Sequence, residues 1–453
     1  MIRPAPLLIY GLAWRLALPI LKRSARLREG WAQRTGREPL PGPAHLWIQA
    51  ASVGEAYLAA EILARLDNPL PEPLRVLVTT NTSQGLEALQ GILARGNFRA
   101  GVVPACAYFP MDAPHIMRAA LKAVRPLAAV LLESEIWPGF ITACKERGCA
   151  TLLVNGRMSE RSADRYLKLP KFFRSVAPDR VLAMSEADAA RFGRVFGPER
   201  VGRMHNIKFD RIPPPAPAGR DAGTAAPAAP DPVADPVAAL LPPDAPLVVF
   251  GSVREDEELH VLNVIAQLLR AEPRAVAALF PRHAHRQEAW EKLLAGRDIP
   301  FLLRSRCQGQ SQGGTTAPGS VLLWDTFGEL GRAYALARAA FVGGSLAPLG
   351  GQNFLEPLAA GLRPVIGPHW ANFAWVGRDI VRAGLVTEAK DADAVLAALL
   401  AGLRAEPDPD GRARTRAAFE AFTAPRRGGA LAVCTLVAET LRNGYKRLAA
   451  GER

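Results

Sequence analysis

Acidic side chains follow apolar runs at several points of the chain, which is where parallel-sheet enzymes carry much of their chemistry. Glu55 follows the run "HLWIQA", residues 45–50, and opens a helical segment. The helix dipole stabilises a carboxylate in a first turn, so we expect Glu55 to keep a low pKa and to be able to act as a base. The alternative is that Glu55 only stabilises the start of its helix.

The stretch "GGQNFLEPLAAG", residues 350–361, places Asn353 and Glu356 three residues apart at the start of a predicted helix. Such a pair can form a capping box, in which Asn353 caps the helix and Glu356 reaches back to the N–H of the cap. Gly361 can then close the helix in the left-handed conformation. Glycines in this region also allow the backbone to approach a phosphate beside a helix N-terminus. The spacing leaves both interpretations open, capping and nucleotide binding.

Further polar residues follow predicted strands throughout the chain. They lie in "ESEIWP" (133–138), "NGRMSERS" (155–162), "HNIKFD" (205–210), "PRH" (281–283), "GEL" (328–330) and "GPHWANF" (367–373). A lone charge in such a place is usually a salt bridge or a surface residue. Acids after a buried strand are nevertheless costly unless they face a site or a partner. The number of these polar strand ends therefore favours a binding cleft.

Apolar runs of strand length alternate with helical segments, which predicts parallel sheets covered by helices on both faces. In the first half the predicted strands cover residues 45–50, 75–80, 127–133, 150–156 and 180–185. After a Pro/Ala-rich stretch they cover residues 247–252, 275–281, 320–325, 339–345 and 363–368. A chain of 453 residues is long enough for two such doubly wound α/β domains.

We therefore predict five segments. They are an N-terminal apolar and basic helix at residues 1–30, a first Rossmann-like domain at 31–211, a linker at 212–246, a second Rossmann-like domain at 247–430 and a C-terminal helix at 431–453. In two-domain folds of this class the last helix often packs back on the first domain. Two domains joined by a linker create a cleft, and ligands should bind there at the carboxyl ends of the strands.

The N-terminal segment combines an apolar run with a concentration of positive charge. Residues 6–21 are apolar except for Arg15, and residues 1–37 carry eight basic residues and one acid, which is +7 of the net +13. The run is shorter than the ~20 residues that cross a bilayer. We expect a helix that lies in or dips into an anionic membrane surface, with the body on the cytoplasmic side. A cleaved signal peptide and a plain soluble amphipathic helix are the alternatives.

Several classes of protein are disfavoured by what the sequence lacks. There is no G-x-x-x-x-G-K-[ST] loop and no G-x-G-x-x-G after a strand, which argues against P-loop ATPases and Rossmann dehydrogenases. The five cysteines lack metal-ligand spacing and suit small buried residues in a reducing compartment. A pI near 10 raises the question of RNA binding, but the charge lies beside an apolar run and no RNP-like or KH-like pattern is present.

Nine motifs together carry a specific resemblance. "ASVGE", "ESEIWP", "NGRMSERS", "KFD", "PRH", "GEL", "FVGGS", "GGQNFLEP" and "GPHWANF" follow one another over most of residues 45–373. In this order they resemble the 3-deoxy-D-manno-oct-2-ulosonic acid (Kdo) transferases of lipopolysaccharide synthesis, and the basic, apolar N-terminus is similar too. The resemblance implies a GT-B glycosyltransferase fold, in which two Rossmann-like domains face a cleft. It also implies an inverting enzyme that moves Kdo from CMP-Kdo to the lipid A precursor, lipid IVA, at the inner membrane.

The resemblance implies roles for individual residues. Glu55 matches the catalytic base, while Glu133 and Lys208 match residues that stabilise the transition state. The CMP-binding positions match Pro281, Arg282, Phe327, Gly328, Glu329, Asn353, Phe354, Leu355 and Glu356. Because Lys208 and Arg282 could balance the charge of the departing CMP, no metal ion or other cofactor is expected. The expected partners are CMP-Kdo, the lipid A precursor and an anionic membrane surface, with no nucleic acid.

The sequence departs from the family pattern beside the expected donor site. Gln352 stands where the family usually has His. "SVREDEE" (252–258) stands where it usually has "STHEGEE", so that Val253 and Arg254 replace Thr and His. These changes bear on how the donor is handled rather than on its class. Two alternatives remain: another GT-B transferase that uses a UDP-sugar on a membrane lipid, and a non-catalytic membrane-surface binder with the same fold.

Overall fold

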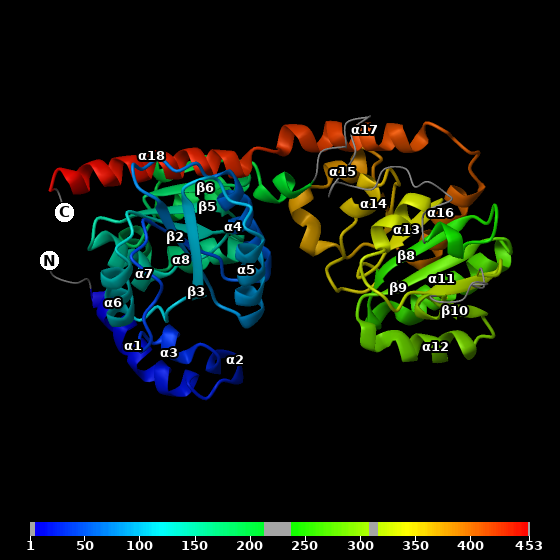
Figure 1. The fold of residues 1–453 in the computed structure, drawn as a ribbon, viewed down its shortest axis with the longest axis horizontal. Coiled ribbons are helices and arrows are strands. Elements are labelled where there is room, and N and C mark those ends of the chain that lie inside the picture. Colours follow the sequence, from blue (N-terminus) through cyan, green and yellow to red (C-terminus); the bar gives the residue numbers. More distant parts are fainter. Residues whose placement is uncertain (1–4, 213–236, 308–315, 452–453) are drawn as a thin grey trace. The chain divides into compact units, whose positions relative to one another are not determined.

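The chain divides into two compact units (Figure 1). The computed structural model describes residues 5–212, 237–307 and 316–451. Unit 1 comprises Met1–Ile212 and Arg426–Arg453, and unit 2 comprises Pro213–Pro425. Most of the linker predicted at residues 212–246 therefore lies outside the described residues.

Unit 1 is built on a seven-stranded parallel sheet in the order β3-β2-β1-β4-β5-β6-β7. Its strands are β1 (Leu46–Gln49), β2 (Leu74–Thr80), β3 (Val102–Tyr108), β4 (Ala128–Leu132), β5 (Ala150–Gly156), β6 (Arg180–Ala183) and β7 (Val201–Arg203). The helices after the first strand are α4 (Val53–Arg65), α5 (Ser83–Arg95), α6 (Pro114–Val124), α7 (Pro138–Lys145), α8 (Glu160–Leu167), α9 (Pro170–Ser175) and α10 (Glu186–Phe196). The strand order reverses between β1 and β4, which makes this pair the topological switch point of a doubly wound sheet.

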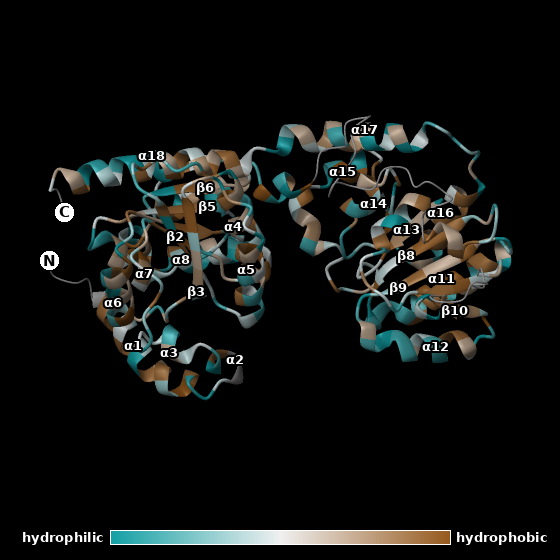
Figure 2. Cartoon of the chain, viewed as in Figure 1, coloured by the Kyte–Doolittle hydropathy of each residue, from teal (hydrophilic) through white to brown (hydrophobic). Residues whose placement is uncertain are grey.

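The central strands of unit 1 are buried on both faces, because helices cover both sides of the sheet. Along β1, Leu46 and Ile48 join one hydrophobic core and Trp47 joins the core on the opposite face. The five residues of β4 follow the same alternation and are all buried. Figure 2 shows the same concentration of hydrophobic residues in the interior strands. Polar side chains are therefore confined mainly to the strand ends.

The C-terminal helix α18 (Gly429–Ala449) belongs to unit 1, although unit 2 precedes it in the chain. Its residues Val433, Val437 and Leu441, spaced four apart, are buried in the core that also contains residues of β1 and α4. Around the start of the helix, Asp210 accepts hydrogen bonds from two backbone N–H groups, both at 2.6 Å. These contacts fasten α18 to the segment that follows β7.

Unit 2 repeats the doubly wound plan, as the sequence predicted, with the strand order β10-β11-β9-β8-β12-β13-β14. Its strands are β8 (Leu247–Val253), β9 (Val276–Pro281), β10 (Phe301–Leu303), β11 (Ser320–Leu323), β12 (Ala339–Val342), β13 (Val365–Ile366) and β14 (Thr387–Glu388). Its helices are α11 (Glu258–Ala271), α12 (Gln287–Ala295), α13 (Leu330–Leu336), α14 (Leu355–Ala359), α15 (Asp379–Arg382), α16 (Ala392–Arg404) and α17 (Gly411–Thr423). The switch point of this sheet lies between β8 and β12.

The structure has a strand at each of the ten predicted positions and adds β3, β7, β10 and β14. Each of these four is an edge strand of its sheet. β3 contains Pro104, whose missing N–H is tolerated at an edge, and the other three strands are two or three residues long. Edge strands are often short and carry residues that blunt further pairing, so their sequences show less of the strand pattern.

The N-terminal segment folds into α1 (Ala5–Leu21), α2 (Ala25–Arg28) and α3 (Trp31–Arg34). One side of α1 packs on unit 1 through Trp14 and Leu18, which contact a small apolar cluster around Ile116. The other side exposes five large apolar residues, Leu8, Ile9, Leu12, Leu16 and Ile20. None of the helices in the described part of the chain is long and apolar enough to cross a membrane.

A buried carboxyl group ties α1 to the rest of unit 1. The hydroxyl of Tyr10 donates to Oδ2 of Asp112 at 2.7 Å. Asp112 also accepts the backbone N–H groups of Gly139 and Phe140, at 2.8 and 2.7 Å, which lie in the first turn of α7. Burial raises the pKa of Asp112 to about 7, although all three donors act in the opposite direction. The position of α1 and the start of α7 thus depend on the same side chain.

In unit 2, Glu257 organises the backbone at the switch point. Its side chain is fully buried and accepts the N–H groups of Gly344, Ser345 and Leu346, the last two at 3.1 and 3.2 Å. The N–H of Arg254 donates to the same carboxylate at 3.0 Å. Three successive N–H groups directed at one anion form a backbone nest, so Glu257 fixes the turn that follows β12.

We predict that Glu257→Ala destabilises unit 2 by about 3 kcal/mol, because it leaves buried N–H groups without their acceptor. For a domain of this size the Tm should fall by roughly 10 °C, measured by calorimetry of the full chain. The matched control is Glu255→Gln, which alters an acid with a 60% exposed side chain near the same turn and should leave the Tm nearly unchanged. Equal Tm values for both variants would contradict the assignment.

Candidate active site

The residues predicted from the sequence lie after the carboxyl ends of strands in both sheets. In unit 1, Glu55 follows β1 and Glu133 follows β4, the two strands that flank the switch point. In unit 2, Arg282 follows β9, Phe327 follows β11 and Asn353 follows β12. Open parallel sheets bind ligands beside their switch points, so each unit presents its candidate residues at the end of the sheet that suits a ligand.

Glu55 is the third residue of α4 and takes part in capping that helix. The hydroxyl oxygen of Ser52 accepts the N–H of Glu55 at 3.4 Å. In return, the Glu55 carboxylate accepts the N–H of Ala51 at 2.7 Å and the hydroxyl of Ser52 at 3.3 Å. The helix-stabilising role considered above is therefore present. Because carboxylate oxygens have acceptor sites to spare, it is compatible with a role as a base.

The expectation that Glu55 has a low pKa was wrong. Burial, with 9% of the residue exposed, is the largest cause that raises the pKa of Glu55, and together with the nearby charges of Glu135 and Glu133 it brings this pKa to about 7. The hydrogen bonds from Ala51 and Ser52 only partly offset these effects. Desolvation and two like charges therefore outweigh the helix-start position. A carboxyl group whose pKa lies near neutrality can accept a proton efficiently at physiological pH.

Glu133 is a buried carboxylate held between two cations. Lys208 Nζ donates to its Oε1 at 2.8 Å, and a guanidinium nitrogen of Arg157 lies 3.0 Å from its Oε2. The Glu133 side chain is 6% exposed, whereas that of Arg157 is 59% exposed. Glu133 also has a φ of 55°, in the left-handed region that is uncommon for residues other than glycine. Backbone strain of this kind tends to collect at functional sites.

Asn155 sets the position of Lys208. Its side-chain oxygen accepts the N–H of Ile207 at 3.0 Å, and the side chain of Asn206 accepts the N–H of Lys208 at 2.9 Å. Asn155 is buried and, like Glu133, has a positive φ, of 53°. Asn155 and Asn206 lie in the motifs "NGRMSERS" and "HNIKFD", but nothing in the sequence indicates that their side chains support Lys208.

The predicted CMP-binding residues of unit 2 differ in how accessible they are. Phe327 is 81% exposed, and Gly328 beside it has a φ of 93°. Glu329 is engaged by its own unit, because Arg304 donates to both of its oxygens at 2.8 and 2.9 Å. Burial alone would raise the pKa of Glu329, but Arg304 and Trp324 lower it overall. The carboxylate thus anchors a turn that carries an exposed aromatic ring.

The pair Asn353 and Glu356 does not form a capping box, which was one of the two interpretations that the spacing left open. The residue that precedes α14 is Phe354, and its side chain does not cap the helix. Asn353 instead accepts the N–H of Leu355 at 3.2 Å and donates to Glu356 at 2.8 Å. Desolvation raises the pKa of Glu356, while Asn353 and the charge of Arg282 act against it.

Other predicted positions in unit 2 offer backbone rather than side chains. Phe354 and Leu355 are buried, with Phe354 packed against Trp370. Pro281 is the last residue of β9, and the N–H of Arg282 is used by the carbonyl of Val253 at 2.8 Å. Among the predicted CMP-binding positions, accessible side chains are therefore those of Arg282, Phe327 and the Asn353–Glu356 pair.

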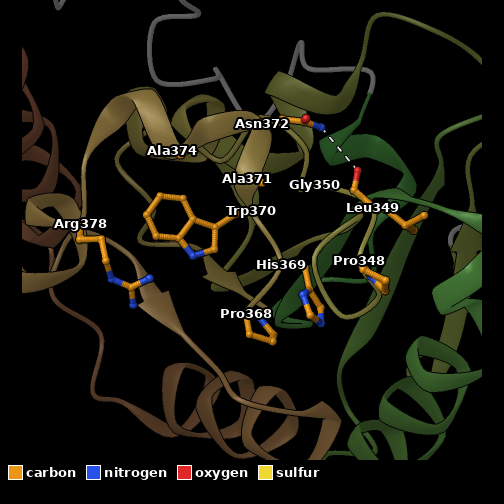
Figure 3. A pocket seen from close by; sticks show the side chains of 10 residues that line it. All are labelled: Pro348, Leu349, Gly350, Pro368, His369, Trp370, Ala371, Asn372, Ala374 and Arg378. Atoms are coloured by element: carbon orange, nitrogen blue, oxygen red, sulfur yellow. Dashed lines mark hydrogen bonds between the residues drawn. The ribbon is translucent and has the colours of Figure 1, made fainter. Parts of the chain in front are cut away.

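A pocket of about 590 Å³ lies beside the start of the stretch 350–361, and the sequence did not predict it (Figure 3). It is lined by Pro348, Leu349, Gly350, Pro368, His369, Trp370, Ala371, Asn372, Ala374 and Arg378. Asn372 donates to the carbonyl of Leu349 at 3.4 Å, which joins the two loops that form the walls. Of the polar strand ends noted in the sequence, only "GPHWANF" contributes to this lining.

The departures at residues 252–258 are compatible with the local structure. Val253 is buried in the core, and Arg254 uses its backbone N–H, which any residue except proline could supply, to bind Glu257. Gln352 donates its backbone N–H to the carbonyl of Gly343 at 3.0 Å.

In the described residues, no group of three or more His, Cys, Asp or Glu side chains could hold a metal ion.

Comparison with known proteins gives a consistent result. A family model described as 3-deoxy-D-manno-octulosonic-acid transferase (kdotransferase) matches residues 29–211. Over 417 residues the chain is 30% identical to the 3-deoxy-D-manno-octulosonic acid transferase of Bordetella pertussis, covering 86% of this chain and 89% of the relative. It is 28% identical over 372 residues to the transferase of the same name from Haemophilus influenzae, with 81% of each chain covered.

Among solved structures, a glycosyltransferase from Rickettsia africae matches with a TM-score of 0.54 at 10% identity, covering 88% of this chain and 99% of that one. At this identity the likeness concerns the fold alone. It agrees with the two doubly wound units described above.

We predict that Glu55→Gln raises the Tm at pH 8 but gives little or no gain at pH 5. A carboxyl group whose pKa is raised on folding contributes stability that is present below its unfolded pKa, near 4.5, and is lost as the pH rises through about 7. The wild type therefore loses up to about 3 kcal/mol over this window, and the neutral amide does not. Calorimetry at both pH values measures the difference. A gain that is independent of pH would contradict the raised pKa.

Proposed function

Because the chain belongs to the 3-deoxy-D-manno-octulosonic acid (Kdo) transferase family, we propose that it moves Kdo from CMP-Kdo to the lipid A precursor, lipid IVA. The observation that carries this proposal is the buried Glu55 at the switch point of unit 1, beside the Glu133–Lys208 ion pair. This arrangement supplies a base whose pKa lies near neutrality next to a fixed positive charge.

In the proposed reaction, Glu55 takes the proton of an acceptor hydroxyl as its oxygen attacks the anomeric carbon of Kdo. The new carbon–oxygen bond forms while the bond to the phosphate oxygen of CMP breaks, and that electron pair leaves with CMP. A single displacement from the opposite side inverts the anomeric configuration, as in glycosidases that use a base rather than a nucleophile. The positive charge that develops on the sugar would be stabilised by the Glu133 carboxylate.

The donor nucleotide is assigned to unit 2. Arg282 supplies positive charge for the phosphate of CMP, and the exposed ring of Phe327 offers a face on which the cytosine ring can stack. The Asn353–Glu356 pair offers amide and carboxylate groups for the ribose hydroxyls. Since the cations Arg282 and Lys208 can balance the negative charge of CMP, the proposal requires no metal ion or other cofactor.

The acceptor and the membrane are assigned to the N-terminal helices. Five large apolar residues of α1 are 56–69% exposed on one side, and seven net positive charges lie within residues 1–37. Such a helix can lie in the interface with its apolar side among the acyl chains and its basic residues near anionic headgroups. The proposed location is the cytoplasmic face of the inner membrane.

Mass spectrometry of the transfer reaction tests the proposed function. Purified protein with CMP-Kdo, lipid IVA and EDTA should give products heavier by one or more Kdo units. Glu55→Ala should reduce the rate by roughly 10²–10⁴-fold, because it removes the base. Glu199→Gln, which changes an acid with a 68% exposed side chain at the other end of the unit 1 sheet, should be as active as the wild type.

The absence of any mass gain by folded wild type would overturn the proposal. Transfer from a UDP-sugar instead, or inhibition by UDP but not by CMP, would favour the alternative GT-B transferase. Activity that disappears with EDTA and returns with a divalent cation would contradict only the metal-independent chemistry.

Flotation with lipid vesicles tests the membrane assignment. We expect the wild type to bind vesicles rich in phosphatidylglycerol and to be released in part by salt, because part of the binding energy is electrostatic. Replacing Leu12 and Leu16 with glutamate should abolish binding without lowering the Tm, since both side chains are exposed. Leu259→Glu changes a 62% exposed leucine of unit 2 and is the matched control. Undiminished binding by the α1 variant would contradict the assignment.

A further inference from the structure

The motif "GPHWANF" and the pocket that it lines in unit 2 take no part in the proposed chemistry. The walls of this pocket come from two loops, residues 348–350 after β12 and residues 368–378 after β13. β12 and β13 are neighbouring parallel strands, so both loops leave the sheet at the same edge. This is the edge at which open parallel sheets bind their ligands.

Glycine lets the two loops approach closely. The N–H of Asn372 donates to the carbonyl of Gly350 at 2.9 Å, and its side chain donates to the carbonyl of Leu349 at 3.4 Å. Gly350 has a φ of 88°, and a Cβ at this position would lie 2.4 Å from the Asn372 side chain. The N–H of His369 donates to the carbonyl of Ser345 at 3.0 Å. The walls are therefore joined by hydrogen bonds of the backbone, as expected for a preformed site.

Three polar side chains of the lining are exposed, those of His369, Asn372 and Arg378. In Figure 3, His369 and Arg378 lie on either side of the Trp370 ring. No hydrogen bond joins the imidazole of His369 to another residue in the part of the chain that the structure describes. An imidazole in this situation can donate a hydrogen bond to a ligand or accept one from it.

Glu388 orients the guanidinium of Arg378 without covering it. Arg378 donates to Oε2 of Glu388 at 2.7 Å, and the indole N–H of Trp370 donates to the same oxygen at 3.1 Å. The Arg378 side chain is nevertheless 62% exposed, and a guanidinium has more N–H donors than this single bond uses. The lining itself contains no Asp or Glu. A pocket with an oriented guanidinium and no carboxylate in its lining favours an anionic ligand.

The pocket adjoins the residues proposed to hold the ribose. Gly350 in its wall precedes Asn353 by three residues, which corresponds to at most about 11 Å of chain. Phe354, which follows Asn353, packs edge-on against Trp370 with the ring centres 5.8 Å apart. In CMP-Kdo a single phosphate joins the ribose to the sugar, so the sugar must lie close to the ribose. The pocket is therefore within reach of a sugar whose ribose is held by Asn353 and Glu356.

We propose that this pocket receives the Kdo group of the donor, with Arg378 binding its carboxylate and His369 and Asn372 binding its hydroxyl groups. The proposal rests on the proposed function, in which unit 2 binds CMP-Kdo. Kdo is a polyhydroxylated sugar acid, so it needs a cation for its carboxylate and several donors and acceptors for its hydroxyl groups. The volume of about 590 Å³ lies within the range of about 300–1,000 Å³ that is typical of small-molecule sites.

The assignment separates two tasks within unit 2. The nucleotide is held by residues that follow β9, β11 and β12, whereas the sugar is selected mainly by residues that follow β13. A neutral sugar on the same nucleotide would leave Arg378 without an anion to replace its water. The pocket therefore discriminates between sugar acids and neutral sugars.

Calorimetric titration of the full chain with CMP and with CMP-Kdo tests the proposal. Arg378→Gln should weaken the binding of CMP-Kdo roughly tenfold and His369→Ala a few-fold, while the Kd of CMP changes less than about twofold. Both side chains are exposed, so neither change should lower the Tm. The matched control is Arg270→Gln, which changes an exposed arginine in the last turn of α11 and should leave both affinities unchanged.

Steady-state transfer gives a second readout. The pocket holds the sugar in the ground state as well as in the transition state, so Arg378→Gln should raise the KM for CMP-Kdo and change kcat less. A higher KM for lipid IVA with an unchanged affinity for CMP-Kdo would assign the pocket to the acceptor and overturn the proposal. Equal losses in the binding of CMP and CMP-Kdo would show that the pocket does not recognise the sugar, and would also overturn it.

The binding experiment needs no acceptor, which keeps this test apart from that of the proposed function. A wild type that binds CMP-Kdo through Arg378 but transfers nothing to lipid IVA would uphold the sugar pocket and contradict only the proposed transfer. Transfer activity together with equal CMP-Kdo affinities in the wild type and Arg378→Gln would overturn the sugar pocket and leave the proposed function intact.

Discussion

The ion pair between Glu133 and Lys208 is the interaction on which the polar end of unit 1 depends. A carboxylate that is 6% exposed loses most of its hydration, and only close cations with good geometry offset that loss. Lys208 reaches Glu133 from the segment after β7, 75 residues away in the chain. The pair therefore joins the centre of the sheet to the segment that also holds the C-terminal helix through Asp210. Asn155 and Asn206 direct the backbone so that the lysine arrives at this point.

The two sheets use the same topological position in different ways. In unit 1 the acids beside the switch point are crowded together, and one of them keeps a pKa near neutrality. In unit 2 the acid at the switch point, Glu257, is fully buried, and its carboxylate accepts four backbone N–H groups. One arrangement keeps a carboxyl group reactive, and the other turns it into part of the scaffold. Unit 2 is left with an ordered turn beside the residues to which nucleotide binding is proposed.

The central strands could be predicted from the sequence, because burial on both faces leaves a continuous apolar run with polar residues at its end. The edge strands could not, since they are short or, like β3, interrupted by proline. The individual site residues came from the resemblance of the motifs, and their roles stay predictions. The pKa of Glu55 was also beyond the sequence. It depends on Glu135, 80 positions later, and on the degree of burial, whereas the local signal was only the helix start. The contacts of Asn353 were also beyond the sequence. Its spacing from Glu356 fitted a helix cap, but its side chain donates to Glu356 directly.

The bond between Tyr10 and Asp112 bears on how the N-terminal helix can work. Asp112 holds both α1 and the first turn of α7, and α7 begins directly after the loop that carries Glu133 and Glu135. The N-terminal helix is consequently not a flexible tether. Whatever surface the exposed apolar residues of α1 contact, these contacts hold the acids of unit 1 at a fixed distance from it. Under the proposed function, the distance between α1 and Glu55 would then limit which acceptor hydroxyls can reach the Glu55 carboxylate, so acceptors would be selected in part by their length.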